Sequence, residues 1–298
     1  MDKNSILGTI GNTPIIELRR YSFNKNVKIF AKLEGRNPGG SIKDRVAHQL
    51  VLSAETKGLI SKNRDIKLIE ATSGNTGIGL AMVSAIRGYK FLAVMPKNAS
   101  TERKKLIKQF GADLLLTDGS KGSNFALKTA QEIVKNTPEK YIMLNQYNNP
   151  ANPEAHFLTT GKEIQQQMPE ITHFVAGMGT GGTLMGVGKR LKQFKKSIKV
   201  IGVEPAKGSK LQGLRNMEEF IPGVYKPALI DKKLIIADDS PALELVGDLA
   251  RISGISVGFS SGAALWGARE LSKSLKNGII VTVFPDSGDR YLSLTPVV

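Results

Sequence analysis

The first residue that could do chemistry is Lys43, which follows the turn-forming stretch 37–41 and falls in the first turn of a predicted helix. The helix dipole and the free amides there disfavour the charged form of a lysine. A neutral amine in such a place can form a Schiff base with an aldehyde. Taken alone, however, the stretch is more typical of an ordinary surface lysine, which a fold tolerates for under about 1 kcal/mol.

A glycine-rich turn, residues 177–183, lies between a predicted strand and a predicted helix. Its backbone N–H groups and the hydroxyls of Thr180 and Thr183 suit a phosphate group. The turn also satisfies the dinucleotide fingerprint G-x-G-x-x-G, with Glu204 at the end of the next predicted strand. By itself it is therefore compatible with an NAD-dependent oxidoreductase, or with a tight turn that binds nothing.

Two more polar turns precede predicted helices, at residues 72–76 and 260–262. The hydroxyls and amides of the first suit a carboxylate, although a well-capped helix start also explains them. Capping by Ser261 is the simpler explanation of the second. A phosphate site, a carboxylate site and a lysine at a helix start together match the needs of pyridoxal phosphate and an amino acid. A nicotinamide enzyme would not need the lysine turn.

Short apolar runs that predict strands alternate along the chain with longer periodic runs that predict helices. The predicted strands are 27–33, 66–71, 91–95, 113–116, 141–144, 173–176, 200–203, 234–237, 256–259 and 279–284. The predicted helices are 43–57, 78–87, 101–110, 124–135, 154–168, 183–194, 241–252 and 261–275. This alternation predicts a three-layer α/β fold with a mostly parallel sheet, and ligands beyond the carboxyl ends of its strands. The Asn/Pro-rich stretch 148–153 is the predicted crossing between two lobes.

Composition narrows the functional classes. The chain has 298 residues, 41% hydrophobic and 23% charged, which is typical of globular proteins. Its net charge of +16 attracts anions, but the basic residues are spread along the chain without a nucleic-acid motif, so we expect no nucleic-acid partner. The absence of cysteine excludes disulfides and a cysteine nucleophile.

Metal and membrane binding are not expected either. His48, His156 and His173 lack the spacing of a metal site, so we interpret them as structural residues. The opening residues 1–4 do not resemble a signal peptide, and no apolar run approaches the length of a membrane span. A soluble cytoplasmic protein is the expectation.

Seven stretches resemble the cysteine synthase group of fold-type II pyridoxal-phosphate enzymes, most closely its cysteine synthase B branch. They span essentially the whole chain and comprise 10–14, 37–45, 70–77, 148–153, 179–183, 260–262 and 288–293. The resemblance implies a tryptophan synthase β-like fold of two lobes with the cofactor in the cleft. Residues 1–42 and 151–298 would form the larger, cofactor-binding lobe, and 43–150 the smaller, mobile lobe. It also implies a homodimer.

The resemblance implies roles for particular residues. Lys43 is the catalytic residue and holds the cofactor as a Schiff base. Asn75 bonds the ring hydroxyl and Ser260 the pyridine nitrogen. The phosphate is bound by Gly179, Thr180, Gly181, Gly182 and Thr183. The substrate carboxylate is bound by Thr72, Ser73, Thr76 and Gln146. Arg215 lies in a segment that resembles the synthase B branch, where an arginine faces the leaving group or a larger sulfur source.

The implied reaction is cysteine synthesis by β-replacement. An O-activated L-serine, either O-acetylserine or O-phosphoserine, would react with sulfide or thiosulfate. A cystathionine β-synthase type of reaction stays open because the core motifs are shared. From other classes, an NAD-dependent oxidoreductase using the turn at 177–182 is the alternative. A non-enzymatic amino-acid or nucleic-acid binder would leave Lys43 and the glycine turn unexplained.

Overall fold

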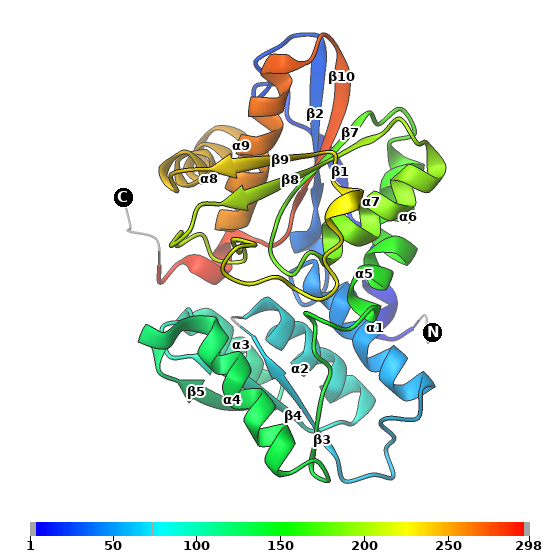
Figure 1. Ribbon diagram of the computed structural model, residues 1–298, viewed down its shortest axis with the longest axis vertical. Helices are drawn as coiled ribbons and strands as arrows, with labels where there is room; N and C mark the ends of the chain where they lie inside the picture. Colours follow the sequence, from blue (N-terminus) through cyan, green and yellow to red (C-terminus); the bar gives the residue numbers. More distant parts are fainter. Residues whose placement is uncertain (1–3, 73, 295–298) are drawn as a thin grey trace. The chain divides into compact units, whose positions relative to one another are not determined.

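The computed structural model describes residues 4–72 and 74–294 (Figure 1). The chain divides into two compact units. Unit 1 comprises the described parts of 1–10, 43–151 and 290–298, and unit 2 comprises 11–42 and 152–289. Thus residues 4–10 and 290–294 cluster with unit 1. Mobility of the 43–150 lobe stays a prediction.

Unit 1, in its described part, is built on a four-stranded parallel sheet with the order β5-β4-β3-β6. The strands are β3 (Lys67–Ala71), β4 (Phe91–Pro96), β5 (Asp113–Thr117) and β6 (Tyr141–Met143). The helices are α1 (Lys43–Thr56), α2 (Asn75–Arg87), α3 (Thr101–Gln109) and α4 (Gly122–Asn136). Right-handed crossovers put α2 and α3 on one face of this sheet and α4 on the other. Gly88 ends α2 in the left-handed conformation, as its position in the sequence predicts.

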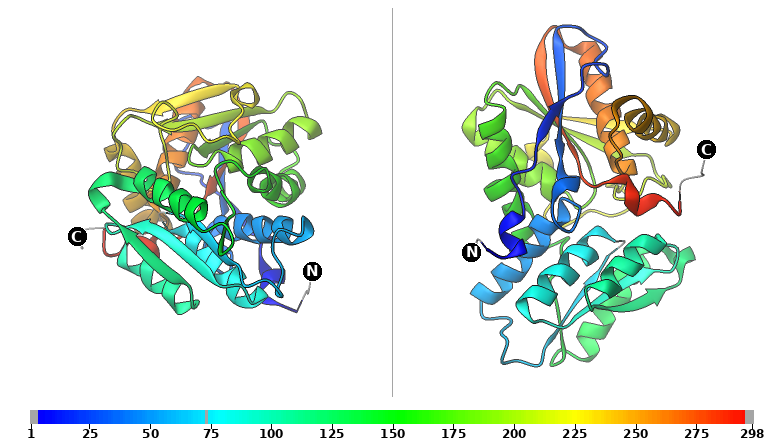
Figure 2. Two further views of the ribbon diagram at one scale, coloured as in Figure 1. Left: turned by 60° about the horizontal axis from the view of Figure 1, so that its bottom comes forward. Right: turned by 180° about the vertical axis from the view of Figure 1, so that it is seen from behind.

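Unit 2, in its described part, contains a six-stranded sheet with the order β1-β2-β10-β7-β8-β9 (Figure 2). Its strands are β1 (Ile15–Glu17), β2 (Val27–Leu33), β7 (His173–Gly177), β8 (Lys199–Pro205), β9 (Lys232–Ile236) and β10 (Gly278–Phe284). Only β1 is antiparallel to its neighbour among these strands. The helices are α5 (Ala151–Ala155), α6 (Gly161–Gln167), α7 (Gly182–Phe194), α8 (Ser240–Ser253) and α9 (Phe259–Ser274).

The sheet of unit 2 is apolar on both faces, because alternate residues of its strands enter different cores. Val175 and Val203 join the cluster formed with α8 and α9. Phe174 and Val200 join the cluster formed with α6 and α7. Two buried faces are expected of a parallel sheet covered by helices on both sides. The predicted three-layer, mostly parallel α/β architecture is therefore confirmed.

Three predicted elements differ from the structure. Helix α2 begins at Asn75, three residues before the predicted start at Ile78. The predicted strand 256–259 is wrong, because 254–258 carries no strand and α9 already begins at Phe259. The predicted helix 154–168 is interrupted by a π-helical segment, His156–Thr160. Among the described residues, no helix is both long enough and apolar enough to cross a membrane.

Candidate functional site

The predicted site residues form two groups, one in each unit. Unit 1 contains Lys43, Thr72, Asn75, Thr76 and Gln146. Unit 2 contains Gly179, Thr180, Gly181, Gly182, Thr183, Arg215 and Ser260. Ser73 lies outside the described residues.

Lys43 is the first residue of α1 and is half-buried. Its backbone lies against α2, where a Cβ on Gly79 would come within 3.1 Å of the Lys43 carbonyl oxygen. Because glycine leaves this space open, the first turn of α1 can approach α2 closely. The lysine is therefore held at a helix N-terminus by backbone packing, in the position that the sequence predicts.

The turn that leads to Lys43 is anchored within unit 2. The Ile42 amide donates to the Pro285 carbonyl oxygen at 2.8 Å. Ser41 forms an isolated β-bridge with Asp286. Gly40 adopts a φ of 78°, which favours glycine. The segment directly before the lysine is thus fastened to the residues that follow β10.

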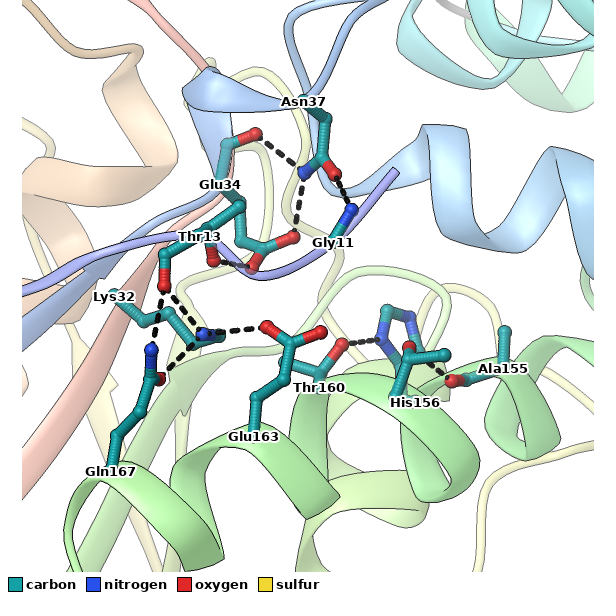
Figure 3. Close-up of polar contacts among 11 residues, drawn as sticks. Gly11, Thr13, Lys32, Glu34, Asn37, Ala155, His156, Thr160, Glu163 and Gln167 are labelled. Carbon is teal, nitrogen blue, oxygen red and sulfur yellow. Dashed lines mark hydrogen bonds and ion pairs between the residues drawn. The ribbon is translucent and has the colours of Figure 1, made fainter. Parts of the chain in front are cut away.

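Asn37, at the start of that turn, is held by its own side chain (Figure 3). Its amide nitrogen donates to the backbone oxygen and to the carboxylate of Glu34, both at 2.8 Å. Its amide oxygen accepts the Gly11 N–H at 2.9 Å. The Thr13 hydroxyl donates to the other Glu34 oxygen at 2.7 Å. These bonds connect the segment that directly follows β2 with the opening segment and the turn.

Lys32 is a fully buried lysine that extends the same network (Figure 3). Its ammonium pairs with Glu163 at 2.8 Å and donates to Gln167 at 2.9 Å and to the Thr13 carbonyl oxygen at 3.0 Å. A buried charge needs such partners. Sequence reasoning missed this cluster because Lys32 and Glu163 are distant in the chain. A lysine inside an apolar strand run was the available signal.

Three of the residues predicted to bind the substrate carboxylate lie together in unit 1. The Thr72 hydroxyl oxygen accepts the N–H groups of Gly74 at 3.0 Å and Gly77 at 3.1 Å. The Thr76 hydroxyl donates to the Gln146 amide oxygen at 2.6 Å. The Gln146 amide nitrogen donates to the Ala71 carbonyl oxygen at 3.1 Å. Three predicted residues therefore gather at the N-terminus of α2, where the helix dipole favours an anion.

Glu70 holds Gln146 in place, and sequence reasoning assigned it no role. Its buried carboxyl oxygens accept the backbone N–H of Asn145 at 2.7 Å and of Gln146 at 3.3 Å. Asn145 has a φ of 56°, which is uncommon for a residue other than glycine. Burial raises the pKa of Glu70 to about 8, and the two amide bonds oppose that rise. A glutamate inside an apolar strand was the signal in the sequence.

Asn75 opens α2, and its side-chain oxygen accepts a bond from Arg290 Nη1 at 2.8 Å. Arg290 is buried although it carries a charge. It belongs to the stretch 288–293 that resembles the cysteine synthase group, but the resemblance gave it no role. The two residues are 215 positions apart, so the sequence alone offers no reason to pair them.

The glycine turn of unit 2 leaves little room for side chains at two positions. A Cβ on Gly179 would overlap the Gly213 carbonyl oxygen, and one on Gly182 would overlap the Asn152 side chain. Gly181 has a φ of 82°. Helix α7 begins at Gly182, so the turn presents its amides at a helix N-terminus. This arrangement suits a phosphate group.

The two threonines of the turn are tied to their surroundings. The Thr180 hydroxyl oxygen accepts from Asn152 Nδ2 at 3.1 Å and from the Gly182 amide at 3.3 Å. The Thr183 hydroxyl lies 3.4 Å from His156 Nε2, and His156 Nδ1 lies 3.1 Å from the Thr160 hydroxyl. His156, for which the sequence predicts a structural role, therefore contacts a residue of the turn.

Ser260 and Arg215 lie near the same backbone. Ser260 is the second residue of α9 and is 5% exposed. A Cβ on Gly213 would come within 3.6 Å of the Ser260 hydroxyl oxygen. The Arg215 amide donates to the Met178 carbonyl oxygen at 2.7 Å, and its guanidinium lies 4.7 Å from the centre of the Phe220 ring. Segment 213–215 therefore connects the glycine turn to the start of α9.

Glu204, the acidic residue of the dinucleotide fingerprint, is already engaged. It is buried, and one carboxylate oxygen accepts the Met217 N–H at 2.7 Å. The other pairs with Lys233 at 2.7 Å. In a dinucleotide site this carboxylate should bond a ribose hydroxyl. Its use inside unit 2 argues against an NAD site.

Each unit carries some of the protein groups that pyridoxal phosphate would need. The glycine turn lies at the N-terminus of α7 and carries two hydroxyls that suit a phosphate. Lys43 supplies an amine at a helix N-terminus. Ser260, in the first turn of α9, supplies a hydroxyl for a ring nitrogen. These are the protein groups that this cofactor requires.

Over nearly its whole length the chain is similar to cysteine synthases and to a related solved enzyme. The chain is 48% identical to a cysteine synthase of Aquifex aeolicus, over 98% of this chain and 91% of that protein. It is 42% identical to cysteine synthase B of Escherichia coli, over 96% and 93%. A solved hydrogen sulfide-producing enzyme from Fusobacterium nucleatum superposes with a TM-score of 0.91 at 41% identity, over 97% and 99%.

The family assignment follows from these likenesses and from a family model. The model described as pyridoxal-phosphate dependent enzyme matches residues 6–286. The chain therefore belongs to the family of pyridoxal-phosphate dependent enzymes.

Proposed function

We propose that the protein is a cysteine synthase that replaces the β-substituent of an O-activated L-serine with sulfide, forming L-cysteine. The group Thr72, Thr76 and Gln146 carries this proposal, because its polar side chains gather at a helix N-terminus, where a carboxylate would be favoured. A phosphate site alone would suit many cofactors. A second site for a carboxylate points to an amino acid as the substrate.

When bound, pyridoxal phosphate withdraws electrons from the α-carbon of the amino acid, so that the α-proton and then the β-substituent can leave. The chain's own groups do the rest. The Thr72 hydroxyl and the N-terminal amides of α2 would orient the substrate carboxylate, and Thr76 would hold Gln146 in place beside it. Lys43 Nζ would hold the cofactor and would be the base that accepts the α-proton of the bound amino acid.

Ser260 decides how strongly the ring withdraws electrons. A serine hydroxyl at the ring nitrogen does not stabilise a positive charge there as a carboxylate would. With the cofactor bound, this weaker withdrawal would favour prompt loss of the β-substituent over slower side reactions. The burial of Ser260 supports this role because water is kept from the hydroxyl.

Arg215 is the proposed determinant of the donor. A guanidinium can bind a phosphate through two parallel bonds, whereas an acetyl group offers it no charge. Its backbone bond to Met178 supports a position beside the glycine turn. O-phosphoserine is therefore proposed beside O-acetylserine as donor, and thiosulfate beside sulfide as nucleophile. A homodimer and a cytoplasmic location are proposed on the family resemblance.

The test measures cysteine formed from sulfide with either donor. The wild-type protein should form cysteine, Lys43→Ala should form none, and Lys57→Ala, at an exposed lysine after the same helix, should keep activity within about twofold. Arg215→Ala should lower kcat/KM for O-phosphoserine by about tenfold or more and leave O-acetylserine nearly unchanged. Failure to form cysteine with either donor would reject the proposal. Formation of cystathionine from homocysteine at a higher rate would favour the cystathionine β-synthase alternative.

A further inference from the structure

The contact between Arg290 and Asn75 lies inside unit 1 and joins distant parts of the chain. Arg290 sits in the short 3-10 turn Gly288–Tyr291 and is 3% exposed. Its Nη1 donates to Asn75 Oδ1 at 2.8 Å. A charged donor makes such a bond stronger than one between neutral groups.

The chemistry of the two groups determines the orientation of the amide. A guanidinium can only donate, so the oxygen of the Asn75 carboxamide must point at it. A flipped amide would place N–H groups against N–H groups. The remaining polar atom of the Asn75 side chain is Nδ2, which can only donate. The bond from Arg290 therefore fixes the amide so that Asn75 Nδ2, a donor, points away from the guanidinium.

The segment that carries Arg290 is itself fixed by α3. The Arg103 guanidinium lies 4.3 Å from the centre of the Tyr291 ring. The Ser293 amide and hydroxyl donate to the Glu102 carboxylate at 2.8 and 2.7 Å. These contacts fix the residues that directly follow Arg290 and so restrict the position of its backbone.

Arg103 also shapes the start of α2. Gly74, directly before Asn75, has a φ of 152°, and a Cβ there would overlap the Arg103 side chain. The start of α2 and the C-terminal segment are thus held by the same part of α3. Helix α3 therefore restrains both the backbone of Asn75 and, through the segment that carries Arg290, the Asn75 side-chain amide.

We infer that Arg290 is a positioning residue that orients the Asn75 amide so that Nδ2 donates to the ring hydroxyl oxygen of pyridoxal phosphate. The inference rests on the proposed function, in which Asn75 contacts that oxygen. Arg290 affects the cofactor through Asn75. Its effect on the cofactor should therefore disappear when Asn75 has no side-chain amide.

The experiment is a double-mutant cycle with cofactor binding as its readout. The dissociation constant for pyridoxal phosphate and the visible absorption maximum are measured for the wild type, Arg290→Met, Asn75→Ala and the double variant. Arg290→Met should weaken cofactor binding by about tenfold and shift the absorption maximum. In the Asn75→Ala background the same change should alter the dissociation constant less than about twofold.

Three further variants separate positioning from folding. Ser293→Ala removes a bond from the same segment, so it should lower the melting temperature but leave cofactor affinity within about twofold. Arg290→Lys keeps a cationic donor and should recover part of the affinity. Asn75→Asp keeps a partner for Arg290 but loses the donor. It should therefore fold, even if Arg290→Met does not, and still bind the cofactor weakly.

Equal effects of Arg290→Met in both backgrounds, or full cofactor affinity in Asn75→Asp, would overturn the inference alone. A wild-type protein that takes up no pyridoxal phosphate would overturn the inference together with the proposed function. A wild type that makes cysteine while its Arg290 variants bind the cofactor normally would leave only the proposed function standing.

Discussion

Glu70 should make the stability of the protein depend on pH in an unusual direction. Burial raises its pKa to about 8, compared with 4.5 for an ordinary glutamate. Between these values the native protein keeps a proton that the unfolded chain has lost. The free energy of unfolding therefore falls as the pH rises through this range. At about 1.4 kcal/mol per pH unit, the change between about pH 5.5 and 7.5 is about 2 kcal/mol.

The perturbation is Glu70→Gln, which removes the titration but keeps the size of the side chain. Its amide nitrogen cannot accept a backbone N–H, so the variant should also lose about 1 to 3 kcal/mol at low pH, where the native Glu70 is fully protonated. Between about pH 5.5 and 7.5 the free energy of unfolding of the wild type should fall by about 2 kcal/mol relative to that of Glu70→Gln. Other groups titrate equally in both proteins and cancel in the difference.

The assay is urea unfolding of both holoenzymes at several pH values, with the exposed Glu139→Gln as control. The control should run parallel to the wild type. If the wild type and Glu70→Gln also run parallel across this range, Glu70 does not keep its proton in the native state. The reasoning from burial would then be refuted.

Three other changes probe the site and the core. Gly179→Ala should weaken cofactor binding at least about tenfold, because its Cβ would overlap a backbone oxygen, whereas Gly181→Ala costs only about 1 kcal/mol of backbone strain; equal effects in a cofactor titration would contradict this. Thr76→Val removes the bond to Gln146, so steady-state kinetics should show a donor KM raised about tenfold; an unchanged KM would remove Thr76 from the site. Burial, together with the nearby charge of Arg87, lowers the pKa of His48 below 6.5. The free energy of unfolding, measured in urea, should therefore fall as the pH drops below 6.5. The fall should be smaller in His48→Gln than in the wild type.

Sequence reasoning located most of the fold because strand runs and breakers are local signals. The predicted strand 27–33 matches β2, and Gly88 ends α2 where glycine was expected. It failed where tertiary packing decided the outcome. The start of α2 at Asn75 depends on Thr72, whose hydroxyl accepts the amide of Gly77. A turn of polar residues alone does not reveal that bond.

The candidate site shows the same division. The glycine turn could be predicted because four glycines among seven residues cost conformational entropy, which a fold tolerates where another group approaches the backbone closely. The groups that hold site residues in place could not, because Glu70 and Arg290 act across gaps of about 75 and 215 positions. The π-helical segment at His156 was also beyond prediction, since one extra residue per turn leaves no clear pattern in a short stretch.

The most direct test of the proposed chemistry is chemical trapping of the cofactor on its lysine. The holoenzyme is reduced with borohydride, digested and mapped by mass spectrometry, while its visible spectrum is followed. The proposal predicts a violet-region band that reduction abolishes, and reduced cofactor on the peptide that contains Lys43. Reduced cofactor on another lysine, or a colourless protein that takes up no pyridoxal phosphate, would contradict it.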